Sequence, residues 1–209
     1  AGTPKVVHTI HGFYFNKDSP FLKKLFYGGL EKTAGWFGHI MIAVNNEDRE
    51  MAIKYGIVKR EKIITIYNGV NIEKNESSLA VGTGYFHCCD IKKEFNISKD
   101  DILIGIVGRL YWEKGQMYGI EAIGKLKEHF PGIKLLLIGK GPDEDNFKYK
   151  VKELGLDDSV IFTGFRKDIA DWLEIMDIFL LPSLREGMSI TLLEAMAAGK
   201  PIICTDIRG

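Results

Sequence analysis

Short apolar runs alternate with longer amphipathic stretches through the second half of the chain, from residue 100 to residue 209. The apolar runs predict buried parallel strands at residues 102–107, 134–138, 160–163, 178–181 and 201–204. The stretches between them predict helices at residues 117–130, 142–154, 168–176 and 189–198. Regular alternation of strand and helix is typical of an α/β fold, so we expect a parallel sheet covered by helices and joined by right-handed crossovers.

The first part of the chain repeats this alternation over fewer elements. We expect strands at residues 5–10, 40–44 and 63–67, and helices at residues 21–37 and 46–55. Asn46 is a suitable N-cap for the second of these helices, because acidic residues follow it in the first turn. Residues 71–84 are polar, contain glycine and lack periodicity. The sequence therefore predicts two α/β domains, at residues 1–72 and 100–209, joined by a linker at residues 73–99.

The helix expected at residues 21–37 is rich in aromatic and aliphatic side chains and also carries lysines. Its large apolar residues are Phe21, Leu22, Phe26, Leu30, Trp36 and Phe37. The nearby basic residues are Lys17, Lys23, Lys24 and Lys32. Two interpretations remain open. In one, the helix packs its apolar face on a sheet. In the other, it dips into the headgroup region of a membrane that contains anionic lipids.

Composition argues against several classes of function. The chain has 28 basic and 28 acidic residues and a formal net charge of zero, so no overall positive charge favours nucleic acid. No apolar run is long enough to cross a bilayer. The three cysteines, Cys88, Cys89 and Cys204, are more typical of a reducing compartment than of a disulfide framework. His87 precedes the adjacent cysteines, but no second ligand cluster accompanies them, so we expect no metal site.

The strand predicted at residues 178–181 leads into a polar loop and a helix that together form the first candidate site. Glu186 lies in the loop, and Ser189 occupies the N-cap position of the helix. Gly187 lets the backbone approach a ligand closely, and the N–H groups of a helix start attract anions. Glu194 adds a second carboxylate, and carboxylates accept hydrogen bonds from pairs of sugar hydroxyls. This combination predicts a site for a sugar phosphate, unless both glutamates are simply solvated charges.

Further loops at strand carboxyl ends carry residues that suit a phosphate ligand. Gly108 and Arg109 directly follow the first strand of the second domain, and Lys114 precedes the next helix. Arginine offers a planar fork of donors to a phosphate, and lysine offers a point charge. Residues 139–141, Gly-Lys-Gly, lack the ending and spacing of a phosphate-binding P-loop. We interpret them as a turn, with Lys140 as a surface charge.

Two more loops complete the set of candidates. Phe165 and Arg166 follow the strand at residues 160–163, and His11 follows the first strand of the chain. His8 lies within that first strand, and we interpret it as a packed core residue. Ligands of open α/β sheets bind at the carboxyl ends of the strands. We therefore expect the loops of the second domain to converge at one sheet edge on a diphosphate, a base and a sugar.

These motifs resemble those of the retaining GT-B glycosyltransferases of the "glycosyl transferases group 1" type. They are Gly108-Arg109-Leu110 with Lys114-Gly115, Ile138-Gly139-Lys140-Gly141-Pro142, Phe162-Thr163-Gly164-Phe165, and Pro182-Ser183 leading into Glu186 and Glu194-Ala195. Residues 4–72 resemble the amino-terminal domain of the subgroup that acts in capsule and exopolysaccharide assembly, through residues 8–15, 31–32 and 67–70. The resemblance implies a GT-B-type fold, in which two Rossmann-like domains carry parallel sheets flanked by helices.

The resemblance also implies a reaction. A sugar would pass from a nucleoside-diphosphate sugar, a UDP- or GDP-sugar, to a glycan or lipid-linked acceptor, with retained anomeric configuration and with no metal or other cofactor. Arg109 and Lys114, beside the turn at Gly108, would bind the diphosphate and neutralise the leaving group. Phe165 and Arg166 would lie beside the base.

The resemblance assigns the sugar to another group of residues. Glu186 would bind the donor sugar near its reacting carbon, and His11 would contact the sugar from the facing domain, so these two are the candidate catalytic residues. Backbone amides of Gly187–Ser189, including that of Met188, would face the sugar or the phosphate, and Glu194 would bind the ribose hydroxyls. The departing phosphate would accept the acceptor proton. The loop cations argue against a glycosidase, which also pairs two carboxylates but needs no diphosphate clamp.

The resemblance further implies that the chain is a middle fragment of a complete family member. It would lack the first strands of the amino-terminal domain and the last strands of the nucleotide-binding domain. Two alternatives remain: a non-catalytic nucleotide-sugar-binding subunit or partner half, and a GT-B-related sugar-nucleotide epimerase. The location implied by the family is the cytoplasm, with peripheral contact at the inner face of the membrane.

Overall fold

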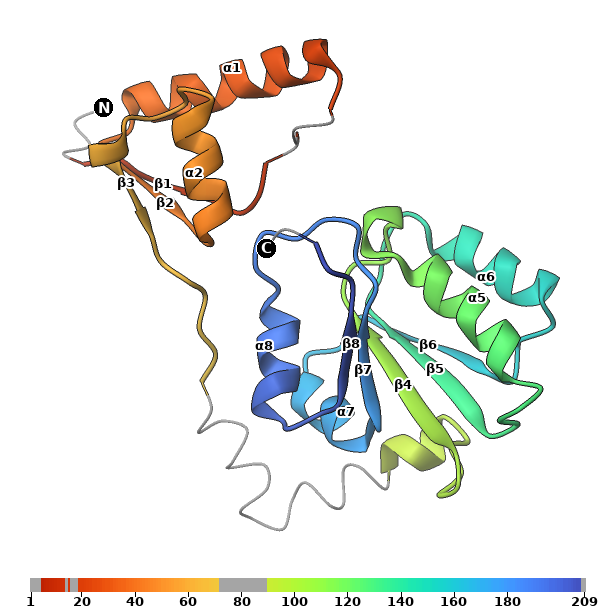
Figure 1. The fold of residues 1–209 in the computed structure, drawn as a ribbon. Coiled ribbons are helices and arrows are strands. Elements are labelled where there is room, and N and C mark those ends of the chain that lie inside the picture. Colours follow the sequence, from red (N-terminus) through yellow and green to blue (C-terminus); the bar gives the residue numbers. More distant parts are fainter. Residues whose placement is uncertain (1–4, 14, 16–18, 72–89, 208–209) are drawn as a thin grey trace. The chain divides into compact units, whose positions relative to one another are not determined.

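The computed structural model describes residues 5–13, 15, 19–71 and 90–207, and these residues form two compact units. Of the described residues, those up to 69 together with 185–189 and 207 form the first unit, and residues 70–71, 90–184 and 190–206 form the second. Each unit contains its own parallel sheet (Figure 1). The polar segment expected to form most of the linker lies outside the described residues, whereas residues 90–94 at its end are helical.

The first unit has a three-stranded sheet with the order β1-β2-β3. Its elements are β1 (Val7–Ile10), α1 (Phe21–Phe37), β2 (Ile40–Ala43), α2 (Asn46–Lys54), the 3-10 helix η1 (Arg60–Lys62) and β3 (Ile63–Thr65). Both strand pairs are parallel, so the strands end at the same edge of the sheet. The α/β class and all five predicted elements are confirmed, with the bounds of α1 as the sequence predicted them.

Helix α1 packs on the rest of its unit through glycines. Its buried residues are Gly28 and Gly35, and a Cβ atom on Gly35 would overlap the carbonyl oxygen of Ile57. The large apolar side chains of the helix are exposed instead: Phe21, Leu22, Leu25, Phe26, Leu30, Trp36 and Phe37. The interpretation in which α1 packs its large apolar side chains on a sheet is therefore wrong within the described residues. The glycines face the core because a residue without a side chain lets the helix backbone approach it more closely.

Two smaller predictions in the first unit are also corrected. The N-cap of α2 is Asn45, whose backbone is extended and whose Oδ1 accepts a 2.7 Å hydrogen bond from the backbone N–H of Asp48. Asn46 is the first residue of the helix and is exposed. His8 is not a core residue, because its side chain is 37% exposed and its Nε2 lies 3.4 Å from Oε2 of Glu31.

The second unit has a five-stranded parallel sheet with the order β6-β5-β4-β7-β8. Its strands are β4 (Ile102–Val107), β5 (Ile133–Ile138), β6 (Val160–Gly164), β7 (Ile178–Leu181) and β8 (Ile202–Cys204). Its helices are η2 (Trp112–Lys114), α5 (Gln116–Leu126), α6 (Glu144–Glu153), α7 (Ile169–Ile175) and α8 (Ile190–Ala197). The strand order reverses between β4 and β7, and such a switch point is where doubly wound sheets bind ligands at their carboxyl edge.

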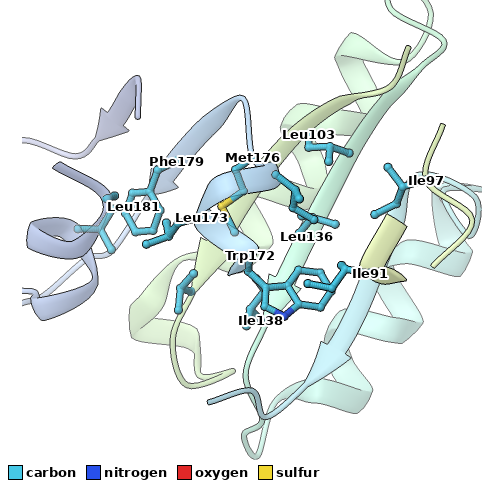
Figure 2. Packing of buried hydrophobic residues seen from close by; sticks show 13 residues of the cluster. Ile91, Ile97, Leu103, Leu136, Ile138, Trp172, Leu173, Met176, Phe179 and Leu181 are labelled. Carbon is cyan, nitrogen blue, oxygen red and sulfur yellow. The ribbon is translucent and has the colours of Figure 1, made fainter. Parts of the chain in front are cut away.

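Helices cover both faces of this sheet (Figure 1), which explains why its strands are apolar at consecutive positions. Along β4, Leu103 and Val107 belong to one core cluster, whereas Ile104 and Ile106 belong to the other. Side chains of α7 and α8 pack in the first cluster, and side chains of α5 and α6 pack in the second. Figure 2 shows the first cluster around Trp172, which is fully buried.

Candidate functional site

Three neighbouring loops at the carboxyl edge of the second unit's sheet are joined by backbone hydrogen bonds. The N–H of Leu110, after β4, donates to the carbonyl of Lys140, after β5, at 3.1 Å. The N–H of Gly139 donates in turn to the carbonyl of Gly164, at the end of β6, at 2.9 Å. The loop after β7 joins them through the N–H of Leu184, which donates to the carbonyl of Glu113 at 2.7 Å. Within this unit, backbone hydrogen bonds therefore join the loops after β4, β5, β6 and β7 at one edge of the sheet.

Glycines make this close approach of the loops possible. A Cβ atom on Gly139 would overlap the carbonyl of Gly108, and one on Gly115 would overlap the carbonyl of Pro182. Gly115 also has a φ of +72°, a left-handed conformation that other residues rarely adopt. The Gly-Lys-Gly segment is irregular, with a bend at Gly139, and Lys140 is exposed on it.

Arg109 and Lys114 lie on the loop between β4 and α5. Arg109 is exposed, and its Cζ lies 5.6 Å from the ring centroid of Tyr111, a distance that allows a cation–π contact. Its carbonyl accepts a 2.8 Å hydrogen bond from Nε2 of Gln116, which is fully buried. Lys114 ends the 3-10 helix η2 directly before Gly115. Both cations therefore lie on a loop whose backbone is fixed by the hydrogen bond from Gln116 to the carbonyl of Arg109.

Gln116 is a supporting residue that the sequence analysis missed. It is the first residue of α5, where a polar side chain is ordinarily solvated, yet none of its surface is exposed. The sequence shows a glutamine directly after Gly115 at the start of a helix. It does not show that this glutamine is buried, which is why its role was missed. By holding the carbonyl of Arg109, the side chain fixes the loop that carries the predicted diphosphate ligands.

Phe165 and Arg166, after β6, differ in what they offer to a ligand. Phe165 is 66% exposed. The guanidinium of Arg166 forms two hydrogen bonds with the carboxylate of Asp168, at 3.0 and 2.7 Å, and lies 5.2 Å from the ring centroid of Trp172. These hydrogen bonds lower the pKa of Asp168 and raise that of Arg166. Arg166 thus ties the loop to the core, and the Phe165 ring is the group exposed to solvent.

Helix α8 begins directly after Ser189, as predicted, and ends in a glycine cap. The N–H of Gly199 donates to the carbonyl of Met196, and the N–H of Lys200 donates to that of Ala195, as in a Schellman motif. Gly199 has a φ of +65°, so the predicted helix end is confirmed. Glu194, on this helix, is half-buried, and burial raises its pKa. A carboxylate with this desolvation cost gains from hydroxyl donors, which would restore lost hydrogen bonds.

The remaining predicted residues lie in the first unit, where residues 185–189 meet the end of β1. A Cβ atom on Gly187 would lie 2.5 Å from the carbonyl oxygen of His11 and 3.1 Å from the backbone N of Gly12. His11 is exposed and Glu186 is half-buried. The structure therefore brings the backbone of His11 against the loop that carries Glu186.

The predicted site residues thus fall into two groups. The second unit holds Gly108, Arg109, Lys114, Phe165, Arg166 and Glu194, and the first unit holds His11, Glu186, Gly187, Met188 and Ser189. Within the described part of the chain, no three or more His, Cys, Asp or Glu side chains are grouped so that they could hold a metal ion. The described loops carry cations, exposed aromatic rings and carboxylates.

Two family models match the sequence. The model for "Glycosyl transferases group 1" matches residues 90–209, and the model for "Glycosyltransferase Family 4" matches residues 1–74. The chain is 34% identical over 213 residues to an Escherichia coli UDP-Gal:alpha-D-GlcNAc-diphosphoundecaprenol alpha-1,3-galactosyltransferase. It is 31% identical over 207 residues to the putative glycosyltransferase EpsD of Bacillus subtilis strain 168. These alignments cover 100% and 98% of the chain but 53% and 52% of the relatives, so the chain spans about half of their length.

Solved structures have the same fold at lower identity. The Anabaena protein Alr3699/HepE, in complex with UDP-glucose, gives a TM-score of 0.80 at 22% identity, over 98% of this chain and 54% of that one. WaaG, a glycosyltransferase involved in lipopolysaccharide biosynthesis, gives a TM-score of 0.83 at 20% identity, over 97% of this chain and 57% of that one. The first family model covers more than half of the chain. This protein therefore belongs to the glycosyl transferases group 1 family.

Proposed function

We propose that the protein transfers a sugar from a nucleoside-diphosphate sugar to a glycan or lipid-linked acceptor in cell-surface polysaccharide synthesis. The transfer retains the anomeric configuration and needs no metal. The observation that carries this proposal is the convergence of the loops after β4, β5, β6 and β7 at the switch point of the second unit's sheet. Membership of the family and the names of its relatives support the reaction class.

In this proposal the loop after β4 binds the diphosphate. The exposed guanidinium of Arg109 forms paired hydrogen bonds to phosphate oxygens, and Lys114 adds a second positive charge. As the bond to the sugar breaks, negative charge grows on the leaving diphosphate, and both cations stabilise it. A comparable preorganised donor in other enzymes lowers the barrier by about 3 kcal/mol.

The nucleoside occupies the neighbouring loops. Glu194 accepts hydrogen bonds from the two ribose hydroxyls, which offset the desolvation that raises its pKa. The exposed ring of Phe165 stacks on the base, and Arg166 holds this loop in place through Asp168. UDP is the first nucleotide to test, because two relatives carry it in their names or titles. GDP remains the alternative.

Glu186 and His11 act at the sugar. Glu186 binds hydroxyls near the reacting carbon, and His11 contacts the same end of the donor. The acceptor hydroxyl attacks on the face from which the diphosphate departs, and the departing phosphate oxygen takes the acceptor proton. No side chain needs to act as a general base. In this mechanism the loops need cations for the diphosphate and carboxylates for the sugar hydroxyls. They do not need the acid and nucleophile that a glycosidase uses.

Helix α1 supports a lipid-linked acceptor and peripheral contact with the inner face of the cytoplasmic membrane. The side chains of Phe21, Phe26, Trp36 and Phe37 are exposed, with Trp36 at 81%, and three lysines lie on the same helix, Lys23, Lys24 and Lys32. No helix in the described part of the chain is long and apolar enough to span a bilayer. We expect binding to vesicles with anionic lipids to weaken when Lys23 and Lys24 are changed to glutamine. Wild type and this variant should both bind neutral vesicles more weakly than wild type binds anionic ones.

The test is a transfer assay with UDP-sugars in the full-length protein. Glu186→Gln should lower turnover by about 10²-fold or more while the fold is kept, because an amide cannot replace a carboxylate that accepts hydroxyl donors near the reacting carbon. Glu121→Gln, an exposed change on α5, is the matched control and should leave turnover unchanged. Near-normal turnover of Glu186→Gln would contradict the assignment. Donor consumption without an acceptor would indicate an epimerase, and activity only on mixing with a second chain would indicate a partner half.

A further inference from the structure

The segment of residues 185–189 is held by the carboxyl ends of all three strands of the first unit's sheet. Residues 11 and 12 follow β1, Asn45 lies two residues after β2, and Asn68 lies three residues after β3. Each of these positions contacts Gly187 or Met188. The segment belongs to the first unit, although the residues on either side of it in sequence belong to the second.

Asn45 makes the most buried of these contacts. Its Nδ2 donates to the carbonyl oxygen of Gly187 at 2.7 Å and to Oδ2 of Asp48 at 2.9 Å. Its Oδ1 caps α2 by accepting from the backbone N–H of Asp48 at 2.7 Å. Asn45 is 7% exposed and Asp48 is fully buried. Three hydrogen bonds thus fix the orientation of the Asn45 amide, and one of them is directed at the candidate site.

Asn68 makes the second contact, from the turn after β3. Its Nδ2 donates to the carbonyl oxygen of Met188 at 3.1 Å, and its backbone N–H lies 3.2 Å from the Met188 sulfur. Two successive carbonyls of the segment, those of Gly187 and Met188, are therefore each bound by an asparagine amide. The absence of a side chain on Gly187 lets the same segment lie against the backbone of His11.

A bound carbonyl also fixes the amide that follows it. The peptide group is planar and its C=O and N–H point in opposite directions when the bond is trans. With the carbonyls of Gly187 and Met188 directed at Asn45 and Asn68, the N–H groups of Met188 and Ser189 are directed away from the asparagines. These are two of the three amides that the resemblance to the family assigns to the donor sugar or phosphate.

We propose that Asn45 and Asn68 are positioning residues for the donor: they fix the backbone amides of residues 188–189, and with them Glu186, before the nucleotide sugar binds. The proposal rests on the proposed function of this loop. Preorganised donors cost no rearrangement when the ligand arrives, whereas a loop that must first be ordered binds more weakly. Because Arg109 and Lys114 bind the diphosphate, the loss of either asparagine should affect the sugar more than the UDP portion.

Asn45→Ser separates the two roles of this residue. Serine is as good an N-cap as asparagine, so α2 keeps its cap. Its short hydroxyl carries no amide that could reach Gly187. Asn68→Ala is the second variant, because it removes the other contact without touching α2 or Asp48. Asn46→Ser is the matched control, since Asn46 is the exposed neighbour of Asn45.

The first readout is amide hydrogen exchange at residues 185–189 in this chain, measured by mass spectrometry without ligand. We expect exchange to be roughly three- to tenfold faster in Asn45→Ser and Asn68→Ala than in wild type, the loss expected for one hydrogen bond. Asn46→Ser should exchange at the wild-type rate. Unchanged exchange in both variants would overturn the proposal, whether or not the protein binds a nucleotide sugar.

The second readout compares the dissociation constants of UDP-sugar and UDP. In both variants we expect the constant for UDP-sugar to rise roughly three- to tenfold and that for UDP to stay within about twofold of wild type. Equal changes for the two ligands would overturn the positioning role. If wild type binds neither ligand, the proposed function fails instead, and the exchange experiment still tests whether the asparagines hold the segment.

Discussion

The two units hold their candidate site residues by different means. In the second unit, neighbouring loops are joined by backbone hydrogen bonds, such as that from Leu110 to Lys140, and glycines remove the side chains that would separate them. In the first unit, residues 185–189 are held by the side-chain amides of Asn45 and Asn68. The loops that we propose for the diphosphate are thus held by backbone contacts at the edge of the sheet, whereas the loop that we propose for the sugar is held by two individual side chains.

The cores of the two units differ in a related way. The second unit buries large side chains on both faces of its sheet, with Trp172 at the centre of one cluster. In the first unit, the described residues form one cluster that includes Phe13, Phe15 and Met41, and its longest helix contributes glycines to the packing. Substitutions of large buried side chains should therefore lower the free energy of unfolding most in the second unit. In the first unit, substitutions of closely packed glycines should also lower it.

The largest expected effect is that of Trp172→Ala. Removing a fully buried tryptophan side chain should lower the free energy of unfolding of the second unit by about 3–5 kcal/mol. Trp36→Ala is the matched control, because Trp36 is 81% exposed and its loss should change stability by no more than about 0.5 kcal/mol. Chemical denaturation measures both. Similar losses in the two variants would contradict the role of Trp172 in the core of the second unit.

A smaller effect is expected for Gly187→Ala. The new Cβ would lie 2.5 Å from the carbonyl oxygen of His11, so the segment must move away from β1, at a cost of about 1–3 kcal/mol. Gly29→Ala, on α1, is the control: a Cβ there meets nothing within 4 Å, and the exchange should stabilise the helix by about 0.5–1 kcal/mol. Thermal unfolding should show a lower midpoint temperature for Gly187→Ala and a higher one for Gly29→Ala. Stabilisation by both alanines would refute the close packing of Gly187 on His11.

The smallest effect concerns the acid stability of the second unit. Because its hydrogen bonds with Arg166 hold the pKa of Asp168 below the usual value of an aspartate, the pair contributes stability that is present above about pH 4. That contribution is lost as the pH falls through the lowered pKa of the folded state. For this partly exposed pair we expect about 1 kcal/mol.

Asp168→Asn should therefore lower stability at pH 7 by about 1 kcal/mol and should flatten its dependence on pH below about 4. Denaturation curves recorded from pH 7 to pH 3 measure this difference. A variant whose stability falls as steeply in acid as that of wild type would show that Asp168 does not carry the effect.

The sequence predicted most of the fold because the relevant signals are local. Strands buried on both faces read as continuous apolar runs, so β4 and β7 were placed at their observed bounds. Glycines after strands marked the loops that converge, and Gly199 marked the end of α8. Because loops at strand ends can be recognised locally, the sequence also predicts which cations and carboxylates lie on them; their roles stay a prediction.

The contacts that the sequence did not reveal are those between distant residues. Asn45 and Gly187 are 142 positions apart, and a side-chain amide that binds a backbone carbonyl leaves no periodic pattern. The exposed face of α1 was ambiguous because the sequence alone does not show which side of the helix faces the core, and only packing selects Gly28 and Gly35 for it. Gln116 was missed for a similar reason, since burial of a polar residue depends on the tertiary structure.

The most direct test of the central claim is a titration of this chain with UDP, GDP and ADP, followed by calorimetry, in wild type and in Arg109→Ala and Lys114→Ala. Lys140→Ala, an exposed lysine on the adjacent loop, is the control. We predict that wild type binds one diphosphate, that each of the two variants weakens this binding by about tenfold or more, and that binding of the free nucleoside is unchanged. Equal losses for diphosphate and nucleoside, or no binding by the folded wild-type chain, would contradict a diphosphate site at the carboxyl edge of the second sheet.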